Sequence, residues 1–363
     1  MLTTLIFLIV LAVLIFVHEL GHFLIAKWNG IRVDEFKIGF GPKLLAWGKG
    51  ETKYGLNLIP FGGFVKIHGE NPDDDSISGP DKKRSFVHKK GWQKILVLAA
   101  GVSFNFIFAW LIYVIVFSSG VTASTTLFDK YQTSFKNTRI IVSGISAKSP
   151  AETAGLKVGD ILTGLNQQET ISVTDIQNSA QTSEGRTLTL KYLREDKSGS
   201  VEITPVQGII EGRYALGISM DNVGDLRLPF FSAIYEGGRY TLIMIRETTV
   251  GLLHFFGQIF QGQANFAEVS GPIGIAGIVG SAAQMGFTYL LMITALISIN
   301  LGVINFIPFP ALDGGRILFV LIEGIIRRPI APKYANTVNA TGFVLLMILM
   351  VIVTYKDIVK LIW

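Results

Sequence analysis

The chain alternates long apolar stretches with polar ones, and four of the apolar runs are long enough to cross a bilayer. They cover residues 2–28, 95–117, roughly 287–312 and about 342–362. About 20 consecutive apolar residues span the hydrocarbon core as an α-helix. The pattern therefore predicts a polytopic α-helical membrane protein with four transmembrane helices.

Residues 125–221 have a different character, because short strand-like runs alternate there with turns and charges. RIIVSGI, TLTLKYLRE and GSVEITPV are typical of strands, and Ser149-Pro150 is typical of a helix start. The sequence predicts one β-rich domain between the second and third spans.

The loop after the first span contains a second strand-rich stretch, residues 33–68. YGLNLI and FVKIH flank PFGG, and this pattern predicts a β-hairpin with a glycine turn. Such a hairpin is too short to span a bilayer and unusually apolar for water. We expect a re-entrant hairpin that dips into the membrane; a small interfacial sheet without a catalytic role is the alternative.

These patterns divide the chain into four regions. Residues 222–286 read as membrane-surface helices and a glycine-rich connector, because Arg246, Glu247 and His254 interrupt the apolar run at 228–262. The four regions are a first membrane half at 1–120, the β-rich domain at 125–221, the surface region at 222–286 and a second membrane half at 287–363.

Composition supports a membrane protein with a modest soluble part. The chain of 363 residues is 49% hydrophobic and 16% charged. It has no cysteine, which excludes thiol catalysis, thiolate-bound zinc and disulfides.

The basic residues predict an orientation. Lys and Arg are absent before residue 27 and frequent between 27 and 94, where KKR stands at 82–84. By the positive-inside rule this loop is cytoplasmic, so the N-terminus and the 125–221 domain lie outside. The basic cluster precedes a span directly, which favours a juxtamembrane anchor over a nucleic-acid site.

The first span contains HELGH, residues 18–22, inside its apolar run. His18 and His22 leave one helix face about 6 Å apart along the axis, so their nitrogens can bind one zinc ion. Glu19 can then reach a water as general base. Ionisable groups near the bilayer centre each cost about 2.5–3.5 kcal/mol, a cost that metal binding offsets.

The third span ends in NFIPFPALDGG, residues 305–315, where Pro308 and Pro310 break the helix. Asp313 follows this break at the membrane edge. A carboxylate there is the natural third ligand, which leaves a fourth zinc position open. An ordinary helix-end aspartate is the alternative.

The three motifs HExxH, GxxxN (Gly101 and Asn105) and NxxPxPxLDGG resemble those of the site-2 protease family of intramembrane zinc metalloproteases. The similarity runs over nearly the whole chain, including NLIPFGGFVKI and SGPIGIA. It is greatest to bacterial members that cleave anti-sigma factors, the regulator of sigma-E protease type. SPAETAGLKVGDIL resembles the signature of circularly permuted bacterial PDZ domains.

The resemblance implies specific roles. His18, His22 and Asp313 would bind Zn²⁺, Glu19 would act as the base, and Asn305 would hold the substrate or its oxyanion. The hairpin at 53–68 would pair with an unwound substrate through Gly62, Gly63, Phe64 and Val65.

The resemblance also implies a class of substrates, a cellular location and partners. The protein would cut single-span membrane proteins within or near their transmembrane segment, such as anti-sigma-factor-like substrates or signal-peptide remnants. It would lie in a bacterial inner membrane, follow an upstream site-1 protease and be gated by its PDZ domain, with the active site toward the cytoplasm.

Two departures and two rival classes remain. Val102 stands where the family usually has proline, and the chain has room for one PDZ domain where many relatives have two. An inactive scaffold would lack Glu19, and a metal transporter would show internal repeats, which the sequence does not.

Overall fold

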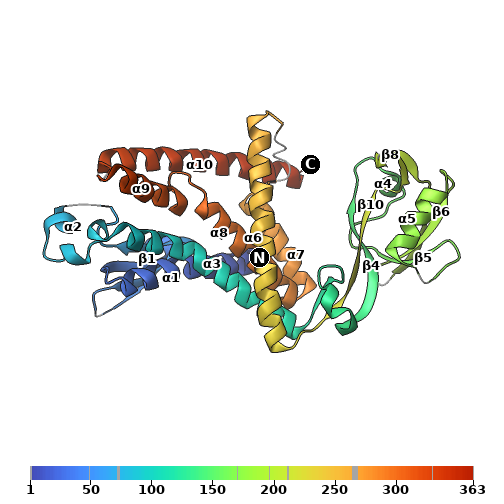
Figure 1. The fold of residues 1–363 in the computed structure, drawn as a ribbon, viewed down its shortest axis with the longest axis horizontal. Helices are drawn as coiled ribbons and strands as arrows, with labels where there is room; N and C mark the ends of the chain where they lie inside the picture. Colours follow the sequence, from blue (N-terminus) through green and yellow to red (C-terminus); the bar gives the residue numbers. More distant parts are fainter. Residues whose placement is uncertain are drawn as a thin grey trace. The chain divides into compact units, whose positions relative to one another are not determined.

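The structure is a computed structural model that describes residues 2–48, 50–71, 74–169, 171–195, 197–210, 212–263, 269–328 and 330–362. It contains two compact units (Figure 1). Unit 1 joins Met1–Val116 with Phe230–Trp363, and unit 2 is Phe117–Pro229.

Unit 1 is helical apart from one small sheet. Its helices are α1 (Leu2–Trp28), α2 (Asp74–Ser78), α3 (Gly91–Ser119, shared with unit 2 at its end), α6 (Phe230–Phe260), α7 (Pro272–Met285), α8 (Phe287–Phe306), α9 (Asp313–Ile326) and α10 (Pro332–Ile362). In the described part of the chain, α1, α3, α8 and α10 are the four helices long and apolar enough to cross a membrane. The expectation of four such helices is confirmed.

Several boundaries differ from the sequence expectation. The third apolar helix ends at Phe306, because Pro308 and Pro310 cannot continue it. The stretch after it forms α9. The connector at 270–280 is also helical, because Pro272 opens α7 and apolar residues surround its glycines.

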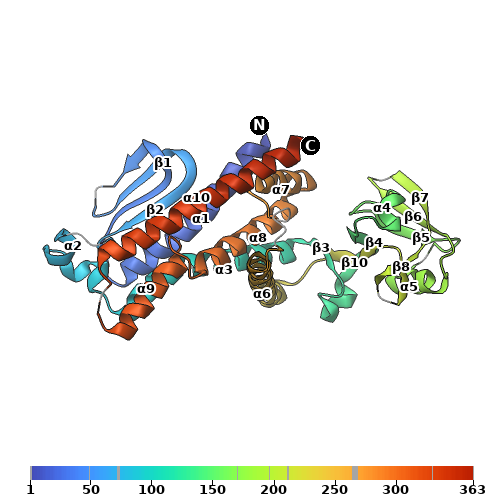
Figure 2. The same cartoon turned by 90° about the horizontal axis from the view of Figure 1, so that it is seen from above.

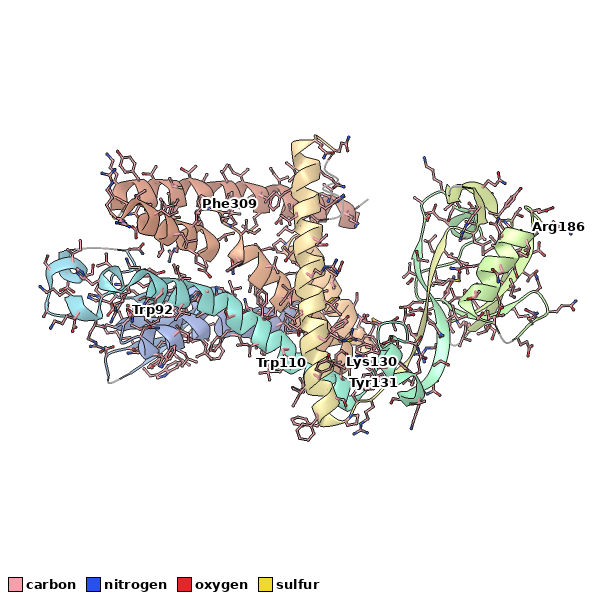
Figure 3. All side chains as sticks on the ribbon, viewed as in Figure 1. Trp92, Trp110, Lys130, Tyr131, Arg186 and Phe309 are labelled. Atoms are coloured by element: carbon pink, nitrogen blue, oxygen red, sulfur yellow. The ribbon has the colours of Figure 1, made fainter. Side chains whose placement is uncertain are left out.

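Residues 230–260 form one continuous helix, α6, where the sequence suggested several. Its side toward α3 is fixed by polar contacts as well as packing. Trp110 Nε1 donates to the carbonyl oxygen of Ile234 at 2.9 Å, and the Tyr113 and Tyr240 rings meet edge to face at 4.8 Å. Figure 3 marks Trp110 at this crossing. Leu242, Leu253 and Phe256 are exposed, as expected of a helix with an apolar outer face.

The sheet of unit 1 differs from the predicted hairpin. Strands β1 (Val33–Trp47) and β2 (Lys53–Ile67) pair antiparallel, but the two runs that flank PFGG pair with 35–38 between them rather than with each other. PFGG lies inside β2, where Gly62 has a φ of 94° and the register shifts. Residues 53–56 run parallel to 35–38 and residues 63–66 run antiparallel to them, so β2 reverses direction between 56 and 63, across PFGG.

The pairing register places part of β1 in the middle of this sheet. Residues 35–38 pair with 63–66 on one side and with 53–56 on the other, and residues 43–47 pair with the outer side of 54–57. In the described part of the chain the segment 63–67 is therefore an outer strand. Figure 2 shows the sheet lying beside α1.

Unit 2 is built on a six-stranded sheet with the order β3-β10-β4-β5-β6-β7. A two-stranded sheet, β8-β9, and the helices α4 and α5 complete it, around a core that includes Val142, Ile176 and Leu190. Its elements are β3 (Val121–Ser124), β4 (Phe135–Ile145), α4 (Pro150–Thr153), β5 (Ile161–Leu165), α5 (Val173–Thr182), β6 (Leu188–Arg194), β7 (Lys197–Ile203), β8 (Val206–Ile210), β9 (Arg213–Ala215) and β10 (Ile218–Leu226).

A buried ion pair fixes the loop before β5. Arg194 Nε donates to Asp160 Oδ1 and Arg194 Nη2 to Asp160 Oδ2, both at 2.6 Å, while the Asp160 side chain is 1% exposed. Burial alone would raise the pKa of Asp160, but the Arg194 hydrogen bonds hold this pKa below its usual value.

Candidate metal centre

Helix α1 brings the two histidines of HELGH together. His18 Nε2 and His22 Nε2 lie 3.3 Å apart, as two residues one helical turn apart can when their rings converge. Two glycines allow α3 to approach. A Cβ on Gly101 would lie 2.4 Å from His22 Nε2, and a Cβ on Gly21 would lie 2.5 Å from the Ala100 carbonyl oxygen.

Asp313 meets this pair from the first turn of α9. Its Oδ2 atom lies 3.2 Å from His18 Nε2 and 3.3 Å from His22 Nε2. The three atoms therefore form a nearly equilateral triangle. Zinc bonds of about 2.0–2.2 Å in a tetrahedron require ligand atoms about 3.3–3.6 Å apart. The spacing fits one Zn²⁺ ion.

The chain break before α9 is what delivers Asp313. Helix α8 ends at Phe306, and Ala311 has a φ of 75°. The two glycines after Asp313 are required by space, because a Cβ on Gly314 would lie 2.3 Å from the Phe306 carbonyl oxygen. A Cβ on Gly315 would lie 2.2 Å from the carbonyl oxygen of Phe309, a residue labelled in Figure 3. The LDGG motif thus folds tightly under the end of α8.

Hydrogen bonds on the far side of each imidazole set its tautomer. His22 Nδ1 lies 2.8 Å from the Val97 carbonyl oxygen and can only donate to it, so the neutral ring presents a lone pair at Nε2. His18 Nδ1 lies 3.1 Å from the side-chain amide of Asn105, which is fully buried. The Asn105 Oδ1 atom has no partner in the described structure. Turning the amide would let Oδ1 accept from Nδ1 and free His18 Nε2 for a metal.

Asn105 is therefore a residue that supports the candidate zinc ligand His18. We expect Asn105→Leu to weaken zinc affinity by about 10–100-fold, the usual effect of losing such a partner. A chelator-competition titration of the purified protein measures this. Asn300→Leu is the matched control, because Asn300 accepts from Thr248 Oγ1 instead. Equal zinc affinity in both variants would contradict the role of Asn105.

The histidines and Asp313 border a cavity of about 830 Å³. Glu19, half-buried, lines it, as do Gly63, Phe64 and Val65 from the outer strand of the sheet. The predicted substrate-binding segment and the predicted base thus face the same space. Gly62, with its positive φ, lies in the chain reversal beside them.

Gly63 is the point where the sheet comes nearest to Glu19. A Cβ there would lie 2.9 Å from Ile15 Cγ2, 3.1 Å from the Lys37 carbonyl oxygen and 3.4 Å from Glu19 Cγ. We expect Gly63→Ala to lower kcat by about 10–100-fold at normal zinc content, because small displacements of a catalytic group are costly. Gly50→Ala is the control, since a Cβ there meets nothing within 4 Å. Wild-type kcat in Gly63→Ala would show that the strand does not constrain Glu19.

Asn305 is not among the residues that line this cavity. It lies one residue before the end of α8 and is partly exposed. Its role in binding substrate stays a prediction. Two other residues that line the cavity were not predicted from the sequence. Arg316 forms an ion pair with Glu70, and His68 is 6% exposed, with an Nε2 atom that has no partner among the described residues.

Charged residues hold the sheet to the helix ends around the cavity. Glu51 pairs with Lys27 at the end of α1, at 2.7 Å, and with Arg84. The hydrogen bond from Lys27 is the main cause of a pKa of Glu51 below its usual value. Arg32 joins Asp34 and Asp81 in the same way, both at 2.7 Å. The linker at 79–86 is thereby fixed against the sheet.

Two histidines, a carboxylate and a neighbouring glutamate, set among apolar helices, define the class of membrane-embedded metal-dependent hydrolases. The model of Peptidase family M50 matches residues 6–349. The chain therefore belongs to peptidase family M50, the site-2 protease family, and is a zinc metalloprotease. The family resemblance and the Zn²⁺ cofactor expected from the sequence are confirmed.

Full-length relatives agree with this assignment. A protein of Clostridium perfringens named "Putative zinc metalloprotease" is 37% identical over 354 residues, which cover 97% of each chain. The zinc metalloprotease RasP of Geobacillus kaustophilus is 29% identical over 427 residues, covering 98% of this chain and 97% of RasP.

Solved structures match part of the chain. Among them is the PDZ domain of an SdrC-like protein from Listeria monocytogenes, with 22% identity and a TM-score of 0.21. The match covers 22% of this chain and 85% of that domain.

Proposed function

We propose that this protein hydrolyses a peptide bond within or near the transmembrane segment of single-span membrane proteins. The observation that carries the proposal is the position of the three candidate ligands. His18 and His22 lie on an apolar helix that can span a membrane, and Asp313 meets them beside a cavity lined by Glu19. We assign zinc binding to these three residues and the role of general base to Glu19.

Zinc bound at this site would polarise the scissile carbonyl and make water a better nucleophile at neutral pH. The protein residues then have separate tasks. Glu19 accepts the proton of the attacking water and passes it to the leaving nitrogen. Val97 and Asn105 keep the imidazoles of His22 and His18 in the orientation that binds metal.

A peptide bond inside a helix is shielded, so the substrate must unwind before it is cut. The outer strand at 63–67 can bind an extended segment by adding it to the sheet edge, next to Glu19. This arrangement supports Gly63, Phe64 and Val65, with Gly62 in the preceding chain reversal, as the substrate-pairing segment.

Removal and return of the metal test the proposal. Purified protein in detergent should contain one zinc per chain and cut a single-span model substrate. Chelation should abolish cleavage, and added Zn²⁺ should restore it. Full activity in metal-free protein would refute the proposal.

We further propose that residues 125–221 form an extracytoplasmic PDZ domain that excludes substrates with large external domains. The signature SPAETAGLKVGDIL includes α4, and Ser149 caps that helix by accepting from the Glu152 backbone N–H. The basic loop at 27–94 supports a catalytic site that lies toward the cytoplasmic side of the membrane. The domain would then act by bulk rather than by contact with the reacting bond.

The domain can be excised cleanly. Strand β3 pairs with the end of β10, with Ser124 opposite Val223, and Thr125 N donates to the Asn222 carbonyl oxygen at 2.8 Å. Deleting 125–221 and joining Ser124 to Asn222 by Asn-Gly removes the Thr125 hydrogen bond but keeps Ser124 opposite Val223, with a three-residue loop between them. We expect normal zinc content and new cleavage of substrates that keep their external domain.

Trimmed and untrimmed forms of one substrate provide the comparison. If the deletion instead slows cleavage of the trimmed form, the domain recruits substrates. If the untrimmed form stays uncut, the size filter lies elsewhere.

We also propose a cellular location and a class of substrates for the enzyme. It would lie in a bacterial inner membrane with its N-terminus outside, and act after a site-1 protease on anti-sigma-factor-like proteins or signal-peptide remnants. The peptidase family and the four apolar helices support a membrane location and membrane substrates.

A further inference from the structure

A second cavity lies in unit 1 apart from the catalytic residues, between α7, α8 and the end of α10. Its volume is about 720 Å³, within the range of sites that bind small ligands. None of the candidate zinc ligands lines it, and neither does Glu19. The proposed proteolytic mechanism gives it no task.

The cavity has an apolar wall and a basic rim. Side chains of α7 and α8, including Ile273, Ile278 and Ile293, form the wall. Lys356 and Lys360, one turn apart on α10, stand at the rim. Neither lysine has an ion-pair partner in the described part of the chain, so both can receive an anion.

Among the described residues, Asp357 is the one acidic residue that lines the cavity, and it is already engaged. Asp357 is 8% exposed, and its oxygens accept from the backbone N–H of Gly271 at 3.2 Å and of Gly274 at 2.8 Å. The carboxylate thereby caps the first turn of α7 and ties it to α10. Within the described part of the chain, the charges of Lys356 and Lys360 are therefore in excess at the rim.

Several features place this cavity at a membrane surface. Lys356 and Lys360 stand at the end of the fourth apolar helix, where chain and lipid headgroups meet. The start of α1 lies alongside, because a Cβ on Gly280 of α7 would lie 2.2 Å from Thr3 Cγ2. By the orientation proposed above, this is the outer leaflet. Basic residues are disfavoured there unless a local anion offsets them.

We propose that this cavity binds one anionic phospholipid, with the phosphate at Lys356 and Lys360 and an acyl chain against the wall of α7 and α8. Basic pockets between membrane helices recognise acidic headgroups in this way. If Lys356 and Lys360 only anchored the end of α10 in the headgroup region, they would need no cavity beside them.

Two variants remove the two halves of the site separately. Lys356→Gln with Lys360→Gln removes the basic rim. Gly277→Phe fills the cavity. A Cβ on Gly277 meets nothing within 4 Å, so the new side chain can enter the cavity without a clash at its Cβ. Lys148→Gln with Lys157→Gln removes the same charge from exposed positions of unit 2 and is the control.

Native mass spectrometry of the full-length protein, titrated with phosphatidylglycerol in detergent, measures binding. We expect one tightly bound lipid, with affinity reduced about thirtyfold by the double lysine variant, at about fivefold per lysine. Gly277→Phe should also lose the lipid, and the control should keep it.

The proposal is overturned if the double lysine variant and the control bind phosphatidylglycerol equally. It is also overturned if phosphatidylcholine binds as tightly as phosphatidylglycerol, or if Gly277→Phe leaves binding unchanged. Displacement by inorganic phosphate at equal concentration would show a simple anion site and exclude the lipid.

Discussion

Glu19→Gln is expected to abolish peptide-bond cleavage while the protein keeps its zinc. Glutamine has the size of glutamate but cannot accept a proton from the attacking water. General-base catalysis contributes about 10²–10⁴-fold, so turnover should fall by at least that factor. Glu19 is not one of the three residues whose ligand atoms converge, so the zinc content should not change.

Turnover and zinc must be measured on the same preparation. Zinc is quantified by elemental analysis, and cleavage by the rate at which a single-span substrate is cut. Gln93→Glu, a reverse exchange at the start of α3, provides a control outside the cavity. Turnover within about tenfold of wild type at full zinc content would remove Glu19 from the mechanism.

Asp313→Ala is expected to lose both the metal and the activity. Two imidazoles on one helix turn bind zinc weakly, and the third donor, Asp313 Oδ2, lies within 3.3 Å of both. The variant should purify with less than about a tenth of a zinc per chain. Catalysis should fall to background for the same reason.

Asp357→Asn tests whether the loss is specific. Asp357 is also a carboxylate buried in unit 1, but it caps α7 and contacts neither histidine in the described structure. This variant should keep one zinc per chain. If Asp313→Ala also keeps one zinc, another group completes the site and the assignment of Asp313 is wrong.

The parts of the site that sequence reasoning could locate are those set by local geometry. Four-residue spacing on a helix puts His18 and His22 on one face, whatever surrounds them. Proline breaks are equally local, so the chain interruption before Asp313 could be predicted from Pro308 and Pro310.

The parts of the site that sequence reasoning missed depend on contacts between segments that are distant in the sequence. Asn105 contacts His18 only because Gly21 and Gly101 let α1 and α3 approach in one register, and no local pattern encodes that register. Arg316 lies in α9, where Glu70 compensates its charge from 246 residues away, and no local pattern indicates this pair.

The sheet shows the same limit. The glycines of PFGG predict a chain reversal, but they do not predict that another strand lies between its two arms. The segment at 33–38 pairs with both 53–56 and 63–67 and so separates the two arms of the predicted hairpin. The outer strand beside Glu19 results from this long-range pairing.

The position of the cut bond in a bilayer decides whether the protein is an intramembrane protease. Purified protein and a single-span substrate are placed together in lipid vesicles, and mass spectrometry identifies the new chain ends. We expect one zinc-dependent cut inside or at the edge of the apolar segment, absent with Glu19→Gln. A cut found only in the water-exposed parts of the substrate, or the same cut made by Glu19→Gln, would rule out intramembrane cleavage by this site.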